Sequence, residues 1–588
     1  MHGDGHCMHV LKASRPSACR RAPVRATLPR SNSRRPFMNA PGPHVSAAHP
    51  EEIALPDWRD LPLRAQVSQL LVMHGSKSDF GLPADDGPLE KFLERYPIGA
   101  IFVGGEVIED GSNHFDWVRE RVEQIRRFSR VPILVSADLE NGGGDVIPGL
   151  TPLPYPMALG AANDPELAAQ VGRATAREGA LAGINWALAP MADLNLHPLS
   201  SNVGPRAFGD SAQRVTPLLR AFCRGMQDEG MAACAKTFPG DGSDYRDQHL
   251  VTTRNLLGRD DWQASYGAVF QSLIDDGVAT IMTGHLSFPA WQKHELPCTI
   301  CPDLTTGLLK ERMGFRGMVV TDAFGMGGIR NHRASIEGAV ESFAAGHDML
   351  LWPDHRFIDR VVEKLERGEI PMSRLEDALT RIWRVKARYA RPLPRHASAT
   401  AACEEVALET ARKALTLMWD RGPLLPLTPR KTPRILLIGT TPHDKAFARF
   451  GLLAEHLRAR GFTVDIIRHI APGELGEREK DYDVLLFCLE RQFHRPLGPM
   501  ELFGEDARNL WSACMCGREK TIAVGFGSPY LIPWYFETAS TAINAYSAVP
   551  ACQEAVAAAL CGEAGFPGTM PVHWENRTSI RSLDELRP

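Results

Sequence analysis

The chain has 588 residues and a formal net charge of −4, with 44% hydrophobic and 23% charged residues. This ordinary balance excludes the basic surface of a nucleic-acid-binding protein, and the length predicts two domains. Because no stretch of about 18 uninterrupted apolar residues offers a membrane span, we expect neither a nucleic-acid nor a membrane partner.

Residues 1–50 are predicted to form a disordered, basic tail. The first 37 residues hold eight lysines and arginines against one acid, Asp4. Such a segment is either an organellar transit peptide or an extension upstream of a start at Met38, and its composition favours the extension. Twelve cysteines without a regular framework favour a reducing compartment, so we expect a cytoplasmic protein.

Between residues 51 and 389, short apolar runs alternate with stretches of helical period, as in βα units around a parallel sheet. Most of the runs end in polar residues, which predicts a TIM-type (β/α)8 barrel with its site at the C-terminal ends of the strands. A doubly wound sheet would gather its ligands at one switch point instead. The seven runs are 98–103, 133–137, 184–191, 231–235, 279–283, 318–321 and 349–352.

Residues 390–402 are predicted to be a linker, and residues 403–588 a smaller C-terminal α/β sandwich domain. Four expected strands, 434–439, 464–467, 484–488 and 521–525, alternate there with helical stretches such as 445–460 and 551–560. Gly525-Phe526-Gly527 lacks the third glycine of a dinucleotide loop, so no cofactor is expected. The pairs Cys298/Cys301 and Cys514/Cys516 have no partner pair at zinc spacing and are interpreted as structural, so no metal is expected either.

The polar strand ends suggest glycoside hydrolysis. With retention of configuration, this chemistry needs a carboxylate nucleophile and a second group that first donates and later accepts a proton. Asp322, at the end of an apolar run, can be the nucleophile. Asp247 and His249 lie two residues apart in one loop, where the carboxylate can orient and assist the imidazole as the acid/base.

Seven motifs resemble those of the glycoside hydrolase family 3 β-N-acetylhexosaminidases of bacteria. In chain order they are 138–140 (DLE), 154–160 (PYPMALG), 189–195 (APMADLN), 202–210 (NVGPRAFGD), 236–249 (KTFPGDGSDYRDQH), 282–285 (MTGH) and 320–322 (VTD). The segments 525–530 and 568–572 resemble the second domain of two-domain members. The resemblance implies a retaining, exo-acting enzyme that removes terminal β-linked N-acetylglucosamine from a glycan through a covalent glycosyl-Asp intermediate.

The same resemblance implies roles for individual residues. Asp322 is the nucleophile, His249 the acid/base and Asp247 its dyad partner. The sugar is expected to contact Asp138, Arg206, Lys236, Thr237, Asp241 and His285, although His285 is equally well explained as a hydrogen-bonded structural residue.

Three departures from the family pattern put the sugar specificity in doubt. Thr237 and Asp241 stand where the family has histidines, and residues 141–146 (NGGGDV) lack the arginine that normally follows the D-x-E element. The catalytic residues themselves match.

Four alternatives stay open. A metal-dependent hydrolase would use clustered histidines such as HxH, which the strand ends lack. A non-catalytic glycan-binding barrel would have no need of Asp322 together with the Asp247/His249 pair. A β-glucosidase of the same family normally takes its acid/base from the second domain, so the DxH motif argues against it. A phosphorylase fits a histidine acid/base, which does not repel an incoming phosphate. The sequence gives no oligomeric state.

Overall fold

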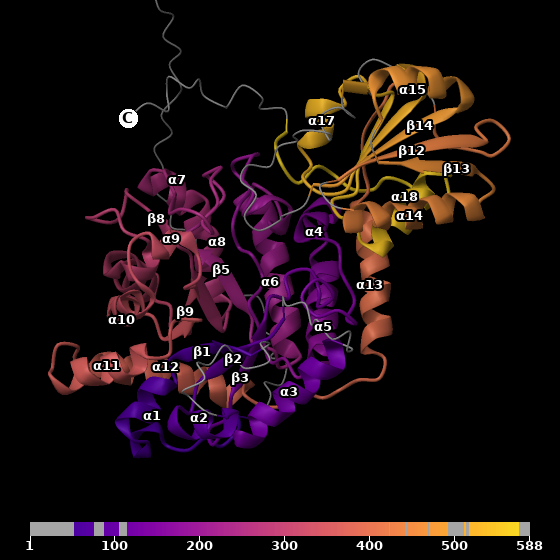
Figure 1. Ribbon diagram of the computed structural model, residues 1–588. Helices are drawn as coiled ribbons and strands as arrows, with labels where there is room; N and C mark the ends of the chain where they lie inside the picture. Colours follow the sequence, from indigo (N-terminus) through magenta and orange to yellow (C-terminus); the bar gives the residue numbers. More distant parts are fainter. Residues whose placement is uncertain are drawn as a thin grey trace, which may run out of the picture. The chain divides into compact units, whose positions relative to one another are not determined.

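A computed structural model describes residues 52–75, 88–104, 114–422, 424–441, 444–468, 470–491, 511–512 and 517–574. The predicted basic tail and the Cys514/Cys516 pair lie outside these residues. Two sheets, each with its own helices, belong to one compact unit (Figure 1). No helix in the described ranges is long and apolar enough to cross a membrane.

The first sheet is an almost closed parallel barrel. Within the described residues its order is β4-β3-β2-β1-β10-β9-β7-β5, and every ladder is parallel. Isolated bridges Trp186↔Ala232 and Met191↔Lys236 join the two edges and complete the ring. The strands are β1 (Leu71–His74), β2 (Ala100–Phe102), β3 (Leu134–Ala137), β4 (Trp186–Ala187), β5 (Cys234–Phe238), β7 (Thr280–Thr283), β9 (Met318–Ala323) and β10 (Met349–Leu351).

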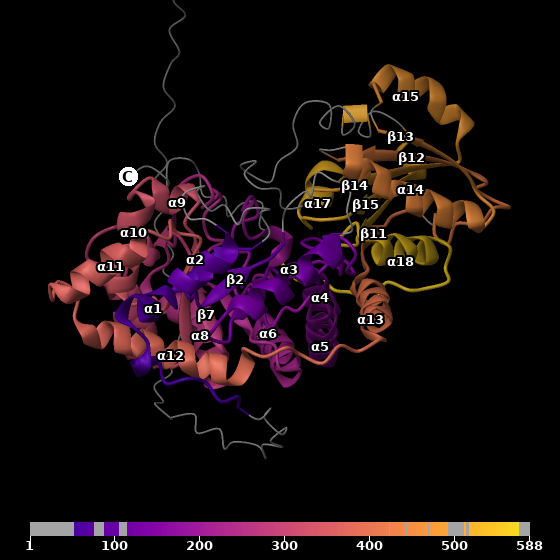
Figure 2. The ribbon, with the colours of Figure 1, turned by 60° about the horizontal axis from the view of Figure 1, so that its bottom comes forward.

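Helices surround this barrel, and a two-stranded ladder of β6 (Thr253–Arg254) and β8 (Leu286–Ser287) lies in the loops that follow β5 and β7 (Figures 1 and 2). The helices are α1 (Leu63–Ser68), α2 (Leu89–Arg95), α3 (His114–Phe128), α4 (Pro156–Ala162), α5 (Pro165–Leu181), α6 (Ala212–Asp228), α7 (Arg259–Ala264), α8 (Tyr266–Asp275), the π-helix η5 (Asp303–Arg312), α9 (Gly327–Arg330), α10 (Ser335–Ala345), α11 (Phe357–Glu366) and α12 (Met372–Tyr389).

The second sheet is mixed, in the order β11-β16-β15-β14-β12-β13, and only β11 is antiparallel to its neighbour among the described strands. Its strands are β11 (Thr416–Asp420), β12 (Arg434–Thr440), β13 (Thr463–Ile467), β14 (Val484–Leu489), β15 (Thr521–Gly525) and β16 (Thr541–Asn544). Its helices are α13 (Ala399–Ala414), α14 (Asp444–Ala459), α15 (Pro472–Arg478), α17 (Leu531–Tyr535) and α18 (Pro550–Leu560).

Side chains of the second sheet alternate between two cores. Ile435 and Leu437 of β12 pack with α14 and α18, whereas Leu436 and Ile438 pack with α15 and α17. A parallel sheet buried on both faces needs such runs of continuous apolar residues. The predicted α/β sandwich is therefore confirmed, as is the predicted barrel.

The structure also corrects the prediction in places. The sequence analysis missed β1 of the barrel and β11 and β16 of the second sheet. Helix α13 begins at Ala399, so the last four residues of the predicted 390–402 linker are helical. In both Figures 1 and 2, α13 runs beside α5 of the barrel, and α13 contributes the buried Cys403 and Ala407 to the barrel's core.

Candidate active site

Four charged side chains pair with one another at the C-terminal ends of β3, β4 and β5. The Lys236 ammonium lies 2.9 Å from Asp138 Oδ1 and 2.5 Å from Glu140 Oε1. Arg206 donates two parallel hydrogen bonds of 2.7 Å to the two oxygens of Glu140. Two cations thus balance two carboxylates, and we call Asp138, Glu140, Arg206 and Lys236 the charged clamp. Its remaining donors and acceptors suit the hydroxyls of a sugar ring.

The charged clamp keeps its charges despite its burial. Burial alone would raise the pKa of Glu140, but Arg206 and Lys236 hold it well below its ordinary value. Burial would likewise lower the pKa of Lys236, yet Asp138 and Glu140 raise it above its usual range. A buried charge is tolerated only when it is paired in this way.

The loop after β5 carries the histidine–aspartate pair. His249 Nδ1 lies 2.7 Å from Asp247 Oδ1, and the same oxygen accepts the backbone N–H of His249 at 2.9 Å. Burial would raise the pKa of Asp247, but the hydrogen bonds and the charge of His249 lower it. An ionised Asp247 fixes the ring with its Nδ1–H toward the carboxylate, so Nε2 is the nitrogen suited to exchange protons with a substrate.

Asp322 is part of β9, the strand two places beyond β5 in the barrel. Its side chain is partly buried, and Oδ1 accepts the Ala323 N–H at 2.8 Å. A cavity of about 260 Å³ is lined by Asp322 together with His249, Asp138, Arg206 and Lys236. With Thr237, six of the sequence-predicted site residues therefore share one cavity, and Asp247 is hydrogen-bonded to one of them, His249.

The other three predicted sugar contacts have different positions. Thr237 also lines the cavity, but its hydroxyl donates to Asp193 Oδ2 at 2.6 Å. Asp241 is 2% exposed and is not among the cavity residues; it accepts a hydrogen bond from Asn202 Nδ2 at 2.8 Å. Asp241 therefore supports Asn202, which does line the cavity, rather than facing the sugar itself.

His285 is fully buried. Its Nδ1 lies 2.6 Å from the Thr299 hydroxyl, and its Nε2 lies 2.9 Å from the Ala323 carbonyl oxygen. Burial lowers its pKa, so the ring is neutral, and Nε2 donates to the backbone next to Asp322. This arrangement fits the structural interpretation of His285, because its ring is hydrogen-bonded to the backbone of Ala323 in β9.

Beneath Thr237, two carboxylates with raised pKa values lie close together. Asp193 accepts the backbone N–H groups of Thr237 and Asp241 at 2.9 and 2.8 Å. Burial and the neighbouring Asp241 raise the pKa of Asp193 to about 8, and burial raises that of Asp241 to about 6. No lysine, arginine or histidine is hydrogen-bonded to this pair in the contacts described.

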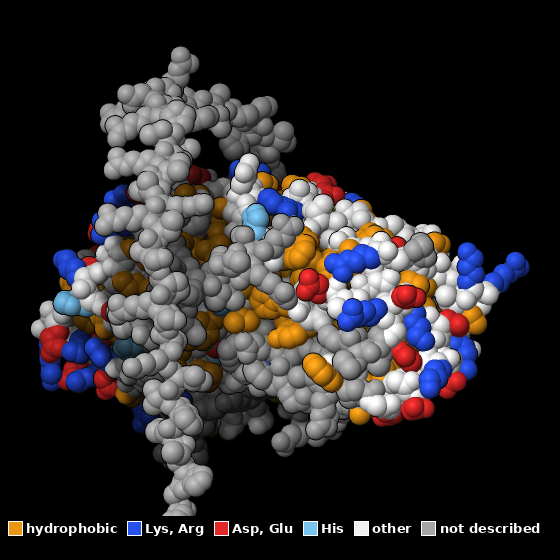
Figure 3. Space-filling model, turned by 90° about the horizontal axis from the view of Figure 1, so that it is seen from above, with side chains coloured by type: hydrophobic (Ala, Val, Ile, Leu, Met, Phe, Trp, Pro, Cys, Tyr) orange, Lys and Arg blue, Asp and Glu red, His pale blue; other side chains and the backbone are white. Residues whose placement is uncertain are grey.

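Another part of the cavity wall is apolar. Met282, Met326, Leu351 and Trp352 line the cavity beside the catalytic residues. Tyr245, Leu250 and Val251, in the loop around the dyad, are exposed. Seen from above, hydrophobic side chains gather in the middle of the face at which the barrel strands end (Figure 3).

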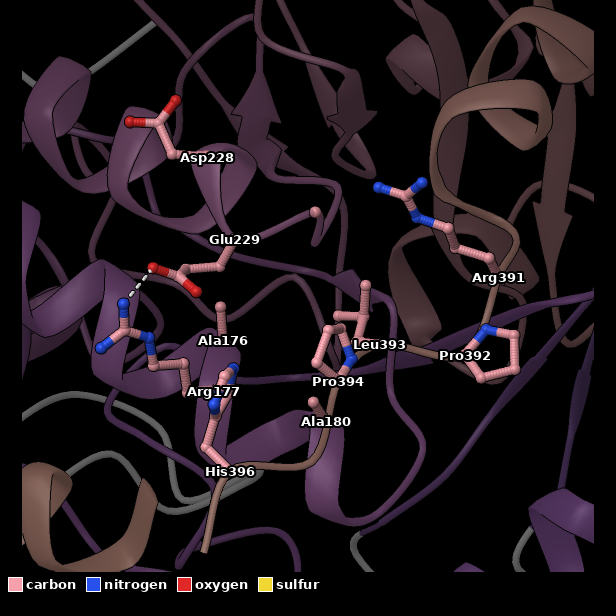
Figure 4. Close-up of a pocket in the computed structure, with 11 residues that line it drawn as sticks. Ala176, Arg177, Ala180, Asp228, Glu229, Arg391, Pro392, Leu393, Pro394 and His396 are labelled. Carbon is pink, nitrogen blue, oxygen red and sulfur yellow. Dashed lines mark hydrogen bonds and ion pairs between the residues drawn. The ribbon is translucent and has the colours of Figure 1, made fainter. Parts of the chain in front are cut away.

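A second cavity, of about 460 Å³, is formed where the linker crosses the ends of α5 and α6 (Figure 4). The Arg177 guanidinium and the Glu229 carboxylate pair there at 2.7 Å, while Arg391 and His396 come from the linker. None of the predicted catalytic residues lines it. Although this cavity is larger, Asp322 and His249 line the smaller one, so we assign the chemistry to the smaller one.

In the described ranges, no group of three or more His, Cys, Asp or Glu side chains is arranged to hold a metal ion. Cys298 and Cys301 are free, buried thiols.

Comparison with known proteins agrees with this geometry. Residues 62–385 match the profile of the glycosyl hydrolase family 3 N-terminal domain. The chain belongs to glycosyl hydrolase family 3. A family 3 relative from Cellulomonas fimi, described as a beta-N-acetylglucosaminidase/beta-glucosidase, is 28% identical over 485 residues, which cover 77% of this chain and 85% of the relative.

Two solved structures of the family resemble the whole architecture. The beta-glucoside phosphorylase BglX, bound to 2FGlc, has a TM-score of 0.78 at 26% identity, over 88% of this chain and 95% of that one. A family 3 beta-N-acetylglucosaminidase from Paenibacillus sp. str. FPU-7 shares the fold, with a TM-score of 0.74 at 24% identity, over 87% and 99% of the two chains. The protein is accordingly a glycoside hydrolase of family 3.

The sequence analysis left three residues of the site unassigned. Glu140 was read only as part of the D-x-E motif, although it is the centre of the charged clamp. Asn202, whose carbonyl oxygen accepts from Arg206 at 2.6 Å, was read only as part of a loop motif. Trp352 was read as the end of an apolar run. The D-x-E spacing is the one signal that could have identified Glu140 as a second carboxylate at the end of the same strand.

Proposed function

We propose that this family 3 enzyme removes terminal β-linked N-acetylglucosamine from glycans, with retention of configuration, through a covalent glycosyl-Asp322 intermediate. The observation that carries the proposal is the shared cavity. A carboxylate on β9, a carboxylate-bound histidine after β5, and Asp138, Arg206 and Lys236 of the charged clamp all border one space of about 260 Å³. The Cellulomonas fimi relative, whose name includes beta-N-acetylglucosaminidase, supports the choice of sugar.

In the first step, Asp322 attacks the anomeric carbon while His249 Nε2 gives a proton to the departing glycosidic oxygen. The Asp247 carboxylate stabilises the imidazolium that donates this proton, since it lies 2.7 Å from His249 Nδ1. In the second step, the neutral imidazole takes a proton from water, which attacks the glycosyl-Asp322 ester and releases the sugar. The charged clamp holds the ring hydroxyls throughout.

Phosphorolysis is a second candidate for the same site. Two observations favour it: the acid/base is a histidine rather than a carboxylate, and the BglX structure, named as a beta-glucoside phosphorylase, matches 95% of its length to this chain. A neutral histidine does not repel a phosphate dianion as a carboxylate would. Inorganic phosphate would then replace water in the second step and yield the sugar 1-phosphate.

The test is release of 4-nitrophenol from its N-acetyl-β-glucosaminide and its β-glucoside, with and without inorganic phosphate and with a chelator present. Faster cleavage of the N-acetylglucosaminide is expected, with free N-acetylglucosamine as the product. Formation of the sugar 1-phosphate would select phosphorolysis, and preference for the glucoside would overturn the proposed sugar. The covalent step is tested by intact mass: His249→Ala, which lacks the base of the second step, should accumulate a glycosylated protein that Asp322→Ala/His249→Ala does not form.

A further inference from the structure

Trp352 has an unusual backbone conformation at the wall of the cavity. It directly follows β10, and its φ angle is 62°, in the left-handed region that glycine adopts freely. A bulky residue there is strained, and such strain persists mainly at functional positions. The backbone is held in place, because the Trp352 N–H donates to the Val72 carbonyl oxygen at 3.0 Å.

Packing alone orients the indole ring of Trp352. Its centroid lies 4.6 Å from that of His74 and 4.8 Å from that of Phe102, and both rings stand at the ends of neighbouring strands. The indole Nε1 is buried and has no hydrogen-bond partner among the described residues. A buried N–H without a partner is unfavourable, so the site retains an unused donor.

Strand order puts Trp352 across the barrel from the charged clamp. Going round the ring, β10 is four strands from β4 in either direction, and β4 lies between β3 and β5, the strands associated with Asp138 and Lys236. Asp322 lies on β9, the neighbour of β10. A sugar whose hydroxyls are held by the charged clamp therefore turns its opposite edge toward Trp352.

The side chains that face that edge of the sugar determine which sugar substituent can bind there. Met282, Met326, Leu351 and Trp352 offer apolar surface and one N–H donor, but no side-chain oxygen that could accept from a hydroxyl. An acetamido group fits this combination, since its methyl prefers an apolar wall and its carbonyl oxygen accepts one hydrogen bond. A sugar hydroxyl in the same place would leave its own donor unsatisfied.

We propose that Trp352 is a specificity-determining residue that selects the 2-acetamido group: the methyl packs against the apolar wall, and the indole N–H donates to the acetyl oxygen. The inference rests on the proposed function and adds the residue that recognises the N-acetyl group. Among the described contacts, Nε1 makes no hydrogen bond that would compete with the acetyl oxygen. Trp352 thereby supplies a sugar contact in a site where Thr237 and Asp241 replace the family's histidines.

The experiment compares kcat/KM for 4-nitrophenyl N-acetyl-β-glucosaminide and 4-nitrophenyl β-glucoside in the parent, Trp352→Phe and Trp352→Gly. Phenylalanine keeps an aromatic wall but lacks the N–H, so the ratio of the two kcat/KM values should fall about 10-fold in favour of the glucoside. Glycine removes the wall as well and relaxes the backbone, so the ratio should fall further. Trp383→Phe is the control, because its indole donates at 2.7 Å to the Pro56 carbonyl oxygen, outside the cavity.

The outcomes separate the two claims. If the parent does not prefer the N-acetylglucosaminide, the proposed sugar is wrong and the role of Trp352 falls with it. If the parent has the preference and Trp352→Phe keeps it, or loses activity equally on both substrates, Trp352 is a structural residue and only this inference is overturned. Should the glycine variant fail to fold, as its thermal unfolding would reveal, the phenylalanine variant decides.

Discussion

At the scale of single residues, the separate roles of Asp322 as nucleophile and His249 as acid/base can be tested by varying the leaving group of the substrate. Asp322→Ala should lose essentially all turnover, because no other carboxylate of the cavity is available as the nucleophile. His249→Ala should lose roughly 10²–10⁴-fold in kcat/KM on substrates with poor leaving groups and far less on activated aryl glycosides, which need little protonation. The measurement is kcat/KM across aryl glycosides of increasing leaving-group pKa.

The matched control for that series is His332→Ala. His332 lies outside the cavity, and its Nε2 lies 2.8 Å from the Thr252 hydroxyl. Its loss should leave the dependence on leaving-group pKa unchanged. Equal losses for His249→Ala on good and poor leaving groups would contradict the assignment of His249 as the general acid.

A second residue-scale prediction concerns the buried carboxylates Asp193 and Asp241, whose pKa values are raised to about 8 and about 6. In the unfolded chain both ionise near pH 4, so between about pH 4 and 8 the unfolded state binds fewer protons than the folded state. Stability attributable to the pair therefore falls as pH rises through this window. Asp241→Asn removes one titrating group and its charge, and should flatten this slope.

The measurement is the midpoint of thermal unfolding at pH 5 and at pH 8. Relative to the parent, Asp241→Asn should be more favourable at pH 8 than at pH 5. Asp359→Asn on α11, whose partly exposed carboxylate pairs with Arg64, provides a control for the loss of a charge away from the pair. An identical difference between variant and parent at both pH values would show that the pair does not titrate as described.

The role of a site residue could be predicted from the sequence when its partners lie close to it in the chain. Asp247 and His249 are two residues apart, so their pairing can be inferred from one loop. Glu140 obtains its role from Arg206 and Lys236, which are distant in sequence and meet it only when the barrel closes. Asp241 is buried against Asn202 and outside the cavity lining, which the motif could not predict because a motif gives a position but not the direction of a side chain.

At the scale of elements, helix α12 contains a buried lysine without a counter-ion among its described contacts. Lys386 is fully buried and donates to Gln69 Oε1 at 2.6 Å. Burial lowers its pKa to about 7, while an unfolded lysine titrates near 10.4. Below pH 7 the folded protein must bury the charged lysine. Between about pH 7 and 10, Lys386 is neutral in the folded state but still protonated in the unfolded state, so stability increases as pH rises.

Lys386→Met removes this titration. Compared with the parent at the same pH, the variant should gain more stability at pH 7 than at pH 9. The gain in free energy of unfolding should change by up to about 1.4 kcal/mol per pH unit. The midpoint of thermal unfolding reports the difference, with Lys480→Met, whose ammonium is 71% exposed, as the control. A gain that is equal at both pH values would contradict the lowered pKa.

Elements were predictable where an apolar run had clear ends. Strands β2, β3, β9 and β12 are flanked by polar or turn residues, and their runs were identified. Strand β1 was missed because it follows α1 after two residues, so Leu70–Met73 continues the apolar spacing of a helix. Strand β11 begins two residues after α13 ends, and three of the four residues of β16 (TAIN) are polar or small; neither strand has the alternation that marks a strand.

At the scale of the whole molecule, the barrel and the second sheet share an apolar cluster. Met157 and Ala158 of α4 are buried with Tyr530, Tyr546 and Val572 of the C-terminal domain. Polar contacts add to it: Arg214 on α6 donates to the Met570 carbonyl oxygen at 2.8 Å. This joint core could not be predicted, because small and aromatic residues on separate elements carry no joint pattern in the sequence.

We therefore expect the two domains to unfold together. A chain ending at Ser398 would expose Met157 together with the face of α5 that packs on α13. Loss of several buried side chains, at about 1.5–3 kcal/mol each, should lower the midpoint of thermal unfolding by roughly 10 °C or more. In the full chain, hydrogen exchange followed by mass spectrometry should show peptides of β12–β15 and of β3–β9 losing protection over the same temperature range. Earlier loss of protection in the second sheet, with the barrel still protected, would mean that the shared cluster contributes little and that the barrel is stable by itself.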